Sequence, residues 1–97
     1  MGIKEYRREI DQIDKAILEK FHERMSVVEK IARYKRENNL PILNKEREEE
    51  VLDGIEVISG PELGQYSKEL FRAIMEISKK YQQDRMELKA LNAEEEK

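Results

Sequence analysis

The stretch that decides the fold runs from Ile3 to about Asn38 and reads IKEYRREIDQIDKAILEKFHERMSVVEKIARYKREN. It contains neither glycine nor proline, and its apolar residues recur at the spacing of one helix face. These residues are Ile3, Tyr6, Ile10, Ile13 and Ile17, continued by Val27, Ile31 and Tyr34. The pattern predicts one helix of about 35 residues, some 50 Å long. Because this exceeds the width of a 97-residue globule, we expect the helix to need a partner chain along part of its length.

Two further helices are predicted after this one. The segment Asn38-Asn39-Leu40-Pro41 ends the first helix, because the residue before a proline is pushed out of the α region. Asn44 is a good N-cap residue for a second helix that reaches about Ile58. The segment Ser59-Gly60-Pro61-Glu62 then predicts a stop and a new start.

The third helix is expected to reach Leu88 or Leu91, since apolar residues keep their helical spacing through Tyr81. The last residues, 92–97, offer little to bury and are predicted to form a frayed C-terminal tail. The sequence therefore predicts one all-α domain over residues 1–91, with helices in the order long, short, long.

Composition excludes several classes of function. The net charge is only −3, with 19 basic and 22 acidic residues interleaved, which gives no reason to expect nucleic acid as a partner. The chain has no cysteine and no apolar run of about 18 residues, so disulfides, thiolate chemistry and a membrane span are not expected. There is also no cluster of metal ligands in the sequence. We expect a cytoplasmic protein without metal or cofactor.

Two cations lie where the first helix should be apolar. Arg24 follows Ile17 by one heptad, and Lys35 follows Arg24 by eleven residues, which is about 20° from three full turns. The two residues thus share a face and stand about 16 Å apart along the axis, a gap that would fit a small dianion. Each alone is readily explained by a salt bridge or by a side chain that reaches solvent. As a pair on one apolar stripe, they fit a structural role and a binding site equally well.

Polar residues also enter the apolar stripe of the third helix, which passes from Ile74 to Ser78 and Gln82. Taken alone, this is the solvated end of the stripe, but together with two cations it predicts a polar pocket between helices. Arg47 lies in the first turn of the second helix, where it opposes the helix dipole. Arg7 precedes Arg24 by 17 residues, roughly 25 Å along the helix and about 100° around it. If both serve one site, they come from different subunits.

The joint pattern resembles a known family, the all-helical class of chorismate mutases. The matching positions are Arg7-x-x-Ile10-x-x-Ile13-Asp14, then Arg24 and Lys35, then Pro41-Ile42-x-Asn44-x-x-Arg47-Glu48, and finally Phe71, Glu76, Ser78 and Gln82. The resemblance covers about Tyr6 to Gln83. It implies a three-helix protomer whose long first helix entwines with that of a second copy, forming a homodimer with two active sites.

The resemblance also implies the role of each site residue in the rearrangement of chorismate to prephenate. Arg7 of the neighbouring protomer, Arg24 and Arg47 would hold the two substrate carboxylates. Lys35 and Gln82 would donate to the ether oxygen, and Glu48 would accept from the substrate hydroxyl. Ser78 and Asn44 would support the site, although bacterial members often carry Asp at the Asn44 position. Some fungal relatives carry Glu at the Gln82 position and need it protonated, so the amide predicts activity that does not require acid pH.

Two other readings stay open at this stage. An isochorismate-pyruvate lyase shares this scaffold and a similar cationic pocket, and its substrate has nearly the same shape and charge. A non-catalytic helical dimerisation or regulatory module would need only the apolar seam of the first helix. That module would leave the polar residues of the stripes unexplained, namely Arg24, Lys35, Ser78 and Gln82.

Overall fold

The computed structural model describes residues 2–95, and within them the side chains of residues 2–86. Two helical elements make up the described chain, α1 (Ile3–Glu37) and α2 (Lys45–Glu95), and these residues form no strand. The predicted all-α class is therefore confirmed. No helix within the described range is both long enough and apolar enough to cross a membrane.

The first break in the chain lies where the sequence predicts it. Helix α1 ends at Glu37, and Asn39 takes the left-handed conformation with φ 55°. The Leu40 amide reaches back to the Lys35 carbonyl at 2.7 Å, so the turn satisfies a carbonyl that the ending helix leaves free. Asn44 then caps α2, its side-chain oxygen accepting from the Arg47 amide at 3.1 Å. The predicted N-cap is confirmed.

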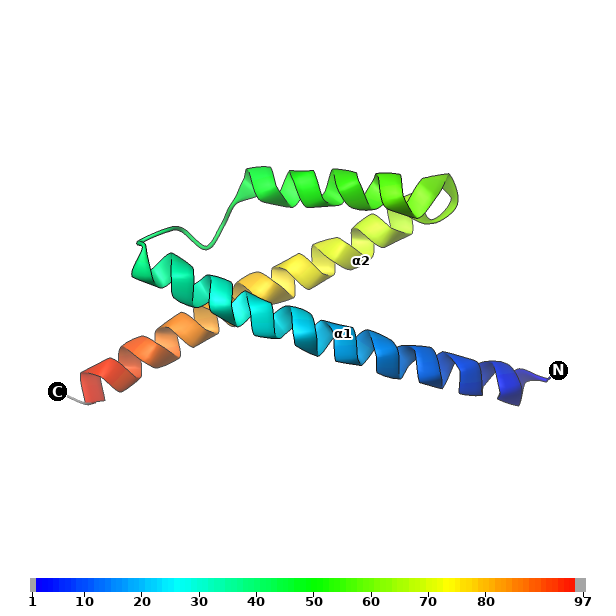
Figure 1. Ribbon diagram of the computed structural model, residues 1–97, viewed down its shortest axis with the longest axis horizontal. Helices are drawn as coiled ribbons and strands as arrows, with labels where there is room; N and C mark the ends of the chain where they lie inside the picture. The colour runs from blue at the N-terminus through cyan, green and yellow to red at the C-terminus, as the bar shows by residue number, and fades with distance from the viewer. Residues whose placement is uncertain (1, 96–97) are drawn as a thin grey trace.

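A sharp kink at Gly60 divides α2 into two arms, residues 45–59 and 61–95. Gly60 has φ 83° and ψ 176°, which is not helical and which a residue with a Cβ rarely adopts. Figure 1 shows the chain turning back on itself there, so that the second arm runs beneath the first. Contacts across the turn fix it, with the Ser59 and Ser67 hydroxyls 2.6 Å apart and Lys68 paired with Glu56 at 3.0 Å. The predicted break at residues 59–62 is confirmed.

The second arm is helical to Glu95, beyond the end expected at Leu88 or Leu91. A frayed tail is predicted at residues 92–97. The structure describes only the backbone of residues 92–95, and residues 96–97 lie outside the described part. The frayed tail stays a prediction.

The core of one chain is small and lies where α1 crosses the second arm of α2 (Figure 1). Its buried apolar residues are Val28 and Ala32 of α1 and Met75 of the second arm. The two buried polar residues, Ser78 and Gln82, follow Met75 on the second arm. The molecule measures 63 × 30 × 14 Å, because the N-terminal half of α1 projects beyond the other helices. A chain with so little burial is expected to gain stability from a further contact.

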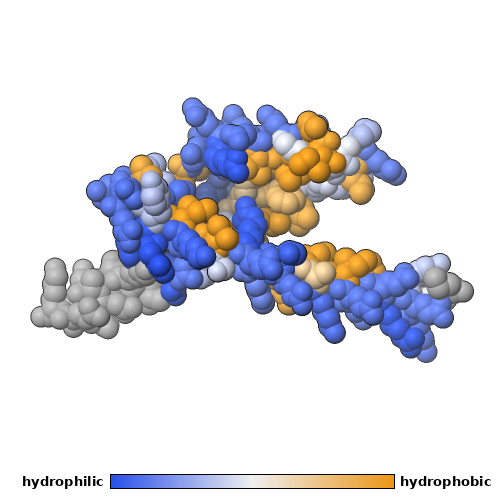
Figure 2. Space-filling view, viewed as in Figure 1, coloured by the Kyte–Doolittle hydropathy of each residue, from blue (hydrophilic) through white to orange (hydrophobic). Residues whose placement is uncertain are grey.

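The projecting half of α1 carries the apolar seam, and Figure 2 shows apolar side chains gathered on it. We call this surface the α1 seam, and its residues are Ile3, Tyr6, Ile10, Ile13 and Ile17. Their exposed fractions lie between 49% for Tyr6 and 61% for Ile3. Five large apolar residues aligned on one exposed face are typical of a surface that another helix covers.

Candidate active site

Arg24 of α1 and Ser78 of the second arm meet at the crossing of the helices. The Arg24 guanidinium donates to the Ser78 hydroxyl at 2.6 Å, and that hydroxyl donates in turn to the Ile74 carbonyl at 2.7 Å. Ser78 is buried and Arg24 is half-buried, and burial lowers the pKa of Arg24 from its ordinary value. The contact joins two residues 54 positions apart that the sequence predicts in one pocket.

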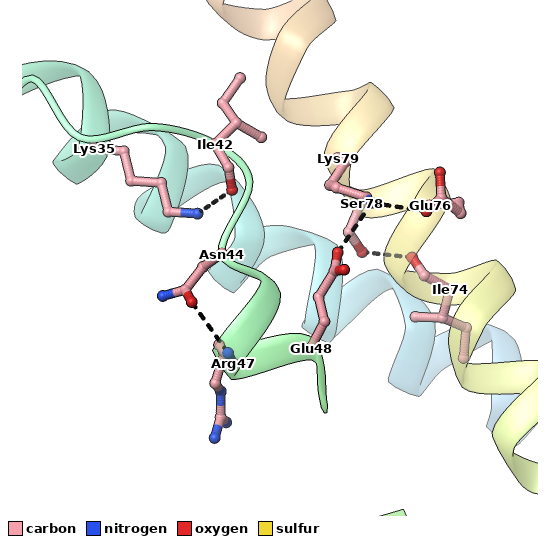
Figure 3. Close-up of polar contacts among 9 residues, drawn as sticks. All are labelled: Lys35, Ile42, Asn44, Arg47, Glu48, Ile74, Glu76, Ser78 and Lys79. Atoms are coloured by element: carbon pink, nitrogen blue, oxygen red, sulfur yellow. Dashed lines mark hydrogen bonds and ion pairs between the residues drawn. The ribbon is translucent and has the colours of Figure 1, made fainter. Parts of the chain in front are cut away.

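Lys35 lies about three turns beyond Arg24 on α1, at the end nearest the loop that connects the two helices. Its ammonium group donates to the Ile42 carbonyl at 2.7 Å (Figure 3). Burial lowers the pKa of Lys35, and the nearby negative charge of Glu48 partly offsets this effect. Lys35 and Glu48 therefore share one electrostatic environment, although they come from different elements.

Gln82 lies one turn after Ser78 on the second arm and is only 6% exposed. Its Oε1 atom is buried and has no hydrogen-bond partner among the described residues. A buried polar atom left unpaired costs about 1–3 kcal/mol, so such atoms are typically completed by a ligand or by water. The amide of Gln82 is thus available for an additional hydrogen bond.

Glu48 is held by a cation that the sequence analysis did not single out. Lys79 lies next to Ser78 and pairs with Glu48 at 3.0 Å and with Glu76 at 2.7 Å (Figure 3). These two carboxylates raise the pKa of Lys79, with Glu76 making the larger contribution. The Glu76–Lys79 pair has i, i+3 spacing and could be read from sequence, but the contact with Glu48 depends on how the two arms of α2 fold together.

Three of the predicted site residues, Arg7, Asn44 and Arg47, lie apart from this group within one chain. Arg47 is exposed, pairs with Glu50 at 2.7 Å, and extends away from Ser78 and Lys79 in Figure 3. Its position in the first turn places it beside the Asn44 cap, which is also exposed. Arg7 is exposed on the projecting half of α1, about 25 Å from Arg24 along the helix. Their roles stay predictions.

The residues that meet in one chain are Arg24, Lys35, Glu48, Ser78, Lys79 and Gln82, from α1 and both arms of α2. A surface hollow of about 270 Å³ borders this group and is lined by Ile42, Leu43, Glu76, Lys79, Lys80 and Gln83. The group offers guanidinium and ammonium donors, a carboxylate acceptor and an amide whose oxygen is unpaired among the described residues. These groups suit a small ligand that carries carboxylates and a hydroxyl.

Comparison with known proteins assigns the chain to a family. The family model described as chorismate mutase type II matches residues 6–83, which is most of the chain and lies within the predicted domain 1–91. The bifunctional chorismate mutase/prephenate dehydratase of Aquifex aeolicus (strain VF5) is 43% identical over 53 residues, covering 55% of this chain. The matched part is only 15% of that relative's length. No solved structure matches the chain.

Proposed function

Because the chain belongs to the chorismate mutase type II family, we propose that it is a chorismate mutase that converts chorismate to prephenate as an intertwined homodimer. The reaction is an intramolecular rearrangement in which a C–O bond breaks while a C–C bond forms. It needs no nucleophile, metal or redox cofactor. The activity belongs to the biosynthesis of the aromatic amino acids phenylalanine and tyrosine.

One observation carries this proposal: Arg24 is hydrogen-bonded to buried Ser78, one turn from a Gln82 whose buried amide oxygen has no partner among the described residues. A structural core would be expected to pair or exclude such groups. A pocket for an anionic substrate instead needs donors, and the Gln82 amide supplies one when it turns so that Nε2 takes the place of the unpaired Oε1. The lack of a partner for Gln82 Oε1 among the described residues thus supports a binding site better than a purely structural role.

Catalysis in this proposal comes from positioning and from charge stabilisation. Arg24 and Arg47, with Arg7 of the second copy, hold the two carboxylates, because the planar guanidinium group matches a carboxylate with two hydrogen bonds. Held this way, the flexible substrate stays in the compact shape in which its reacting carbons are close.

Lys35 and Gln82 donate to the ether oxygen, where negative charge grows as the C–O bond breaks. These interactions strengthen in the transition state and therefore raise kcat. For Gln82 the donor is Nε2, and a half-turn of the amide exchanges it with the unpartnered Oε1. The Lys35 ammonium group has three N–H donors, and the Ile42 carbonyl takes only one of them. Glu48 accepts from the substrate hydroxyl, and Asn44 and Ser78 hold their neighbours in place.

The homodimer is supported by two features of α1. The α1 seam is exposed along the projecting half of the helix, where a second copy would bury it. Arg7 is too far from Arg24 to bind the same small substrate within one chain. In an intertwined dimer the projecting half of α1 reaches the other protomer, which allows Arg7 to complete that protomer's site.

The direct test is to follow the disappearance of chorismate by absorbance and to identify prephenate as the product. Isochorismate is offered in parallel, and release of pyruvate and salicylate from it at a rate equal to or above chorismate turnover would favour the lyase. A purified dimer that neither binds nor consumes chorismate would contradict the proposal.

Shared sites can be tested by mixing two inactive variants, Arg7→Ala and Arg24→Ala. In a mixed dimer with sites built from both chains, one site carries both substitutions and the other carries neither. After unfolding and refolding together, the mixture should regain about a quarter of wild-type activity, since half the dimers are mixed and each has one intact site. No recovery would place both arginines in the same chain's site. A cytoplasmic location, expected from the sequence, remains part of the proposal and is tested by cell fractionation.

A further inference from the structure

Lys79 is the best-connected cation of the described site, yet neither the sequence pattern nor the proposed mechanism gives it a role. It lies on the second arm of α2 between Ser78 and the exposed Lys80. Its ammonium group contacts a carboxylate of its own arm, Glu76, at 2.7 Å and one of the first arm, Glu48, at 3.0 Å. An ordinary surface lysine would not bridge two helical segments.

The burial of the two contacts differs in a way that gives them different roles. The Glu76 side chain is 73% exposed, so this pair mainly fixes the ammonium group against its own helix. The side chains of Lys79 and Glu48 are only 22% and 27% exposed. Water screens this second pair less, and the geometry of Glu48 is therefore fixed more firmly.

The contact also leaves Glu48 able to bind a ligand. Lys79 occupies Oε1 of Glu48, and a carboxylate has further lone pairs on its second oxygen. No described residue donates a hydrogen bond to that second oxygen at hydrogen-bonding distance. The pair thus orients the carboxylate while keeping one oxygen available for a hydroxyl group.

We propose that Lys79 is a positioning residue that holds Glu48 in the orientation needed to accept a hydrogen bond from the substrate hydroxyl. This inference rests on the proposed function, because it takes Glu48 to contact chorismate. Lys79 itself does not touch the reacting atoms. The hydroxyl contact is present in both the ground state and the transition state, so its loss weakens binding more than it slows the chemical step.

The first test is steady-state kinetics of Lys79→Gln beside the matched control Lys30→Gln, which removes the same charge from an exposed position on α1. Lys79→Gln should raise KM about tenfold, the size of one charge-assisted hydrogen bond, with kcat nearly unchanged. Lys30 makes no ion pair among the described residues and does not line the hollow, so its variant should stay near wild type. Lys79→Arg should recover most of the lost affinity, because it keeps a cation beside Glu48. An equal rise in KM in both glutamine variants would mean that only the loss of a positive charge matters, and it would overturn the proposal.

A double-mutant cycle with Glu48→Gln separates positioning from a merely structural role. Once Glu48 has lost its charge, the further change Lys79→Gln should leave KM almost unaltered. If the tenfold effect persisted in the Glu48→Gln background, Lys79 would not act through Glu48. Melting temperatures of all variants show whether any loss comes from unfolding.

A measurement without turnover keeps this inference distinct from the proposed function. The ammonium of Lys79 is titrated by NMR in the wild type and in Glu48→Gln. The pKa of Lys79 should fall toward the ordinary lysine value when Glu48 is neutralised, because one of its two carboxylate partners is lost. An unchanged pKa would overturn the Lys79–Glu48 contact even in an active enzyme. A wild-type protein inactive toward chorismate would overturn the proposed function, and with it the effect on KM, whatever the titration gives.

Discussion

The Arg24 guanidinium and the Ser78 hydroxyl lie 2.6 Å apart and join α1 to the second arm of α2. Ser78 accepts from Arg24 while donating to the Ile74 carbonyl, so its single hydroxyl proton is already used. The orientation of the bond is thereby fixed, with Arg24 as donor. This contact holds the cation at the helix crossing before any substrate arrives.

Replacing Ser78 with alanine is expected to lower kcat/KM about tenfold, because Arg24 loses the acceptor that orients it. The helix itself should tolerate alanine well, so the melting temperature should change little. Ser67→Ala is the matched control, since Ser67 also joins two helical segments by a 2.6 Å side-chain contact, to Ser59, but lies at the Gly60 turn and not in the site. Steady-state kinetics that show the same loss in both variants would contradict a specific role for Ser78.

Replacing Lys35 with methionine, which has a similar length and no charge, is expected to lower kcat roughly 10²–10³-fold, by analogy with the loss of other donors to a developing oxyanion. Lys30→Met is the control, because Lys30 is exposed on the same helix. The decisive measurement is kcat at saturating chorismate. Turnover near the wild-type value in Lys35→Met would refute the assignment.

The activity of the wild type is expected to fall at alkaline pH, beginning at a lower pH than the pKa of an ordinary lysine would give. Burial lowers the pKa of Lys35, so its proton is lost at a lower pH than that of an exposed lysine, and only the protonated form donates to the ether oxygen. Activity is thus retained below the pKa of Lys35 in the folded protein and lost as pH rises through it. In Lys35→Arg, where the guanidinium keeps its proton, this alkaline fall should disappear from the kcat profile up to the pH at which the protein unfolds.

Gln82→Glu is expected to make activity depend on acid pH. An ionised glutamate offers no proton to the ether oxygen and repels its growing negative charge, whereas the protonated form can donate. Gln82 is buried, so a glutamate there should keep its proton to a higher pH than in water. The kcat profile of the variant should therefore fall with rising pH, while that of the wild type stays level across the same range. If the kcat profiles of the two proteins had the same shape over this pH range, that result would argue against contact between residue 82 and the substrate.

Ile13→Asp is expected to convert the dimer to monomers and to abolish activity. Ile13 is 53% exposed in the single chain and lies in the middle of the α1 seam, so a charge there would be buried between two helices. Lys15→Asp introduces the same side chain on the opposite face of α1 and should leave the dimer intact. Light scattering after size-exclusion chromatography gives the molar mass. A dimer that persists in Ile13→Asp would mean that the seam is not the interface.

The helical class and both breaks could be predicted from the sequence because local chemistry determines them. Pro41, the Asn44 cap and Gly60 act on their own backbone or on that of near neighbours. That Arg24 and Ser78 lie together could also be expected, since each interrupts an apolar stripe. In these cases the signal lies within a single helix.

The contacts between the arms of α2 could not be predicted in the same way. Helical periodicity tells which residues share a face, but not which residue of another helix they meet. Nothing in the sequence distinguishes Lys79 from its neighbour Lys80, and the contact of Lys79 with Glu48 depends on the fold. The pair of Arg85 with Glu29 at 2.7 Å escaped prediction for the same reason.

The kink at Gly60 has a consequence for residues that lie far from it. Glu48 and Lys79 are 31 positions apart and would stand about 46 Å from each other on an unbroken helix. The turn reduces this separation to a 3.0 Å ion pair. A residue at position 60 that prefers to continue the helix would therefore dismantle the pocket without altering any group that binds the substrate. Straightened arms from two copies would then pack on each other's α1, an exchange of segments that would preserve helical content while changing the connectivity of every site.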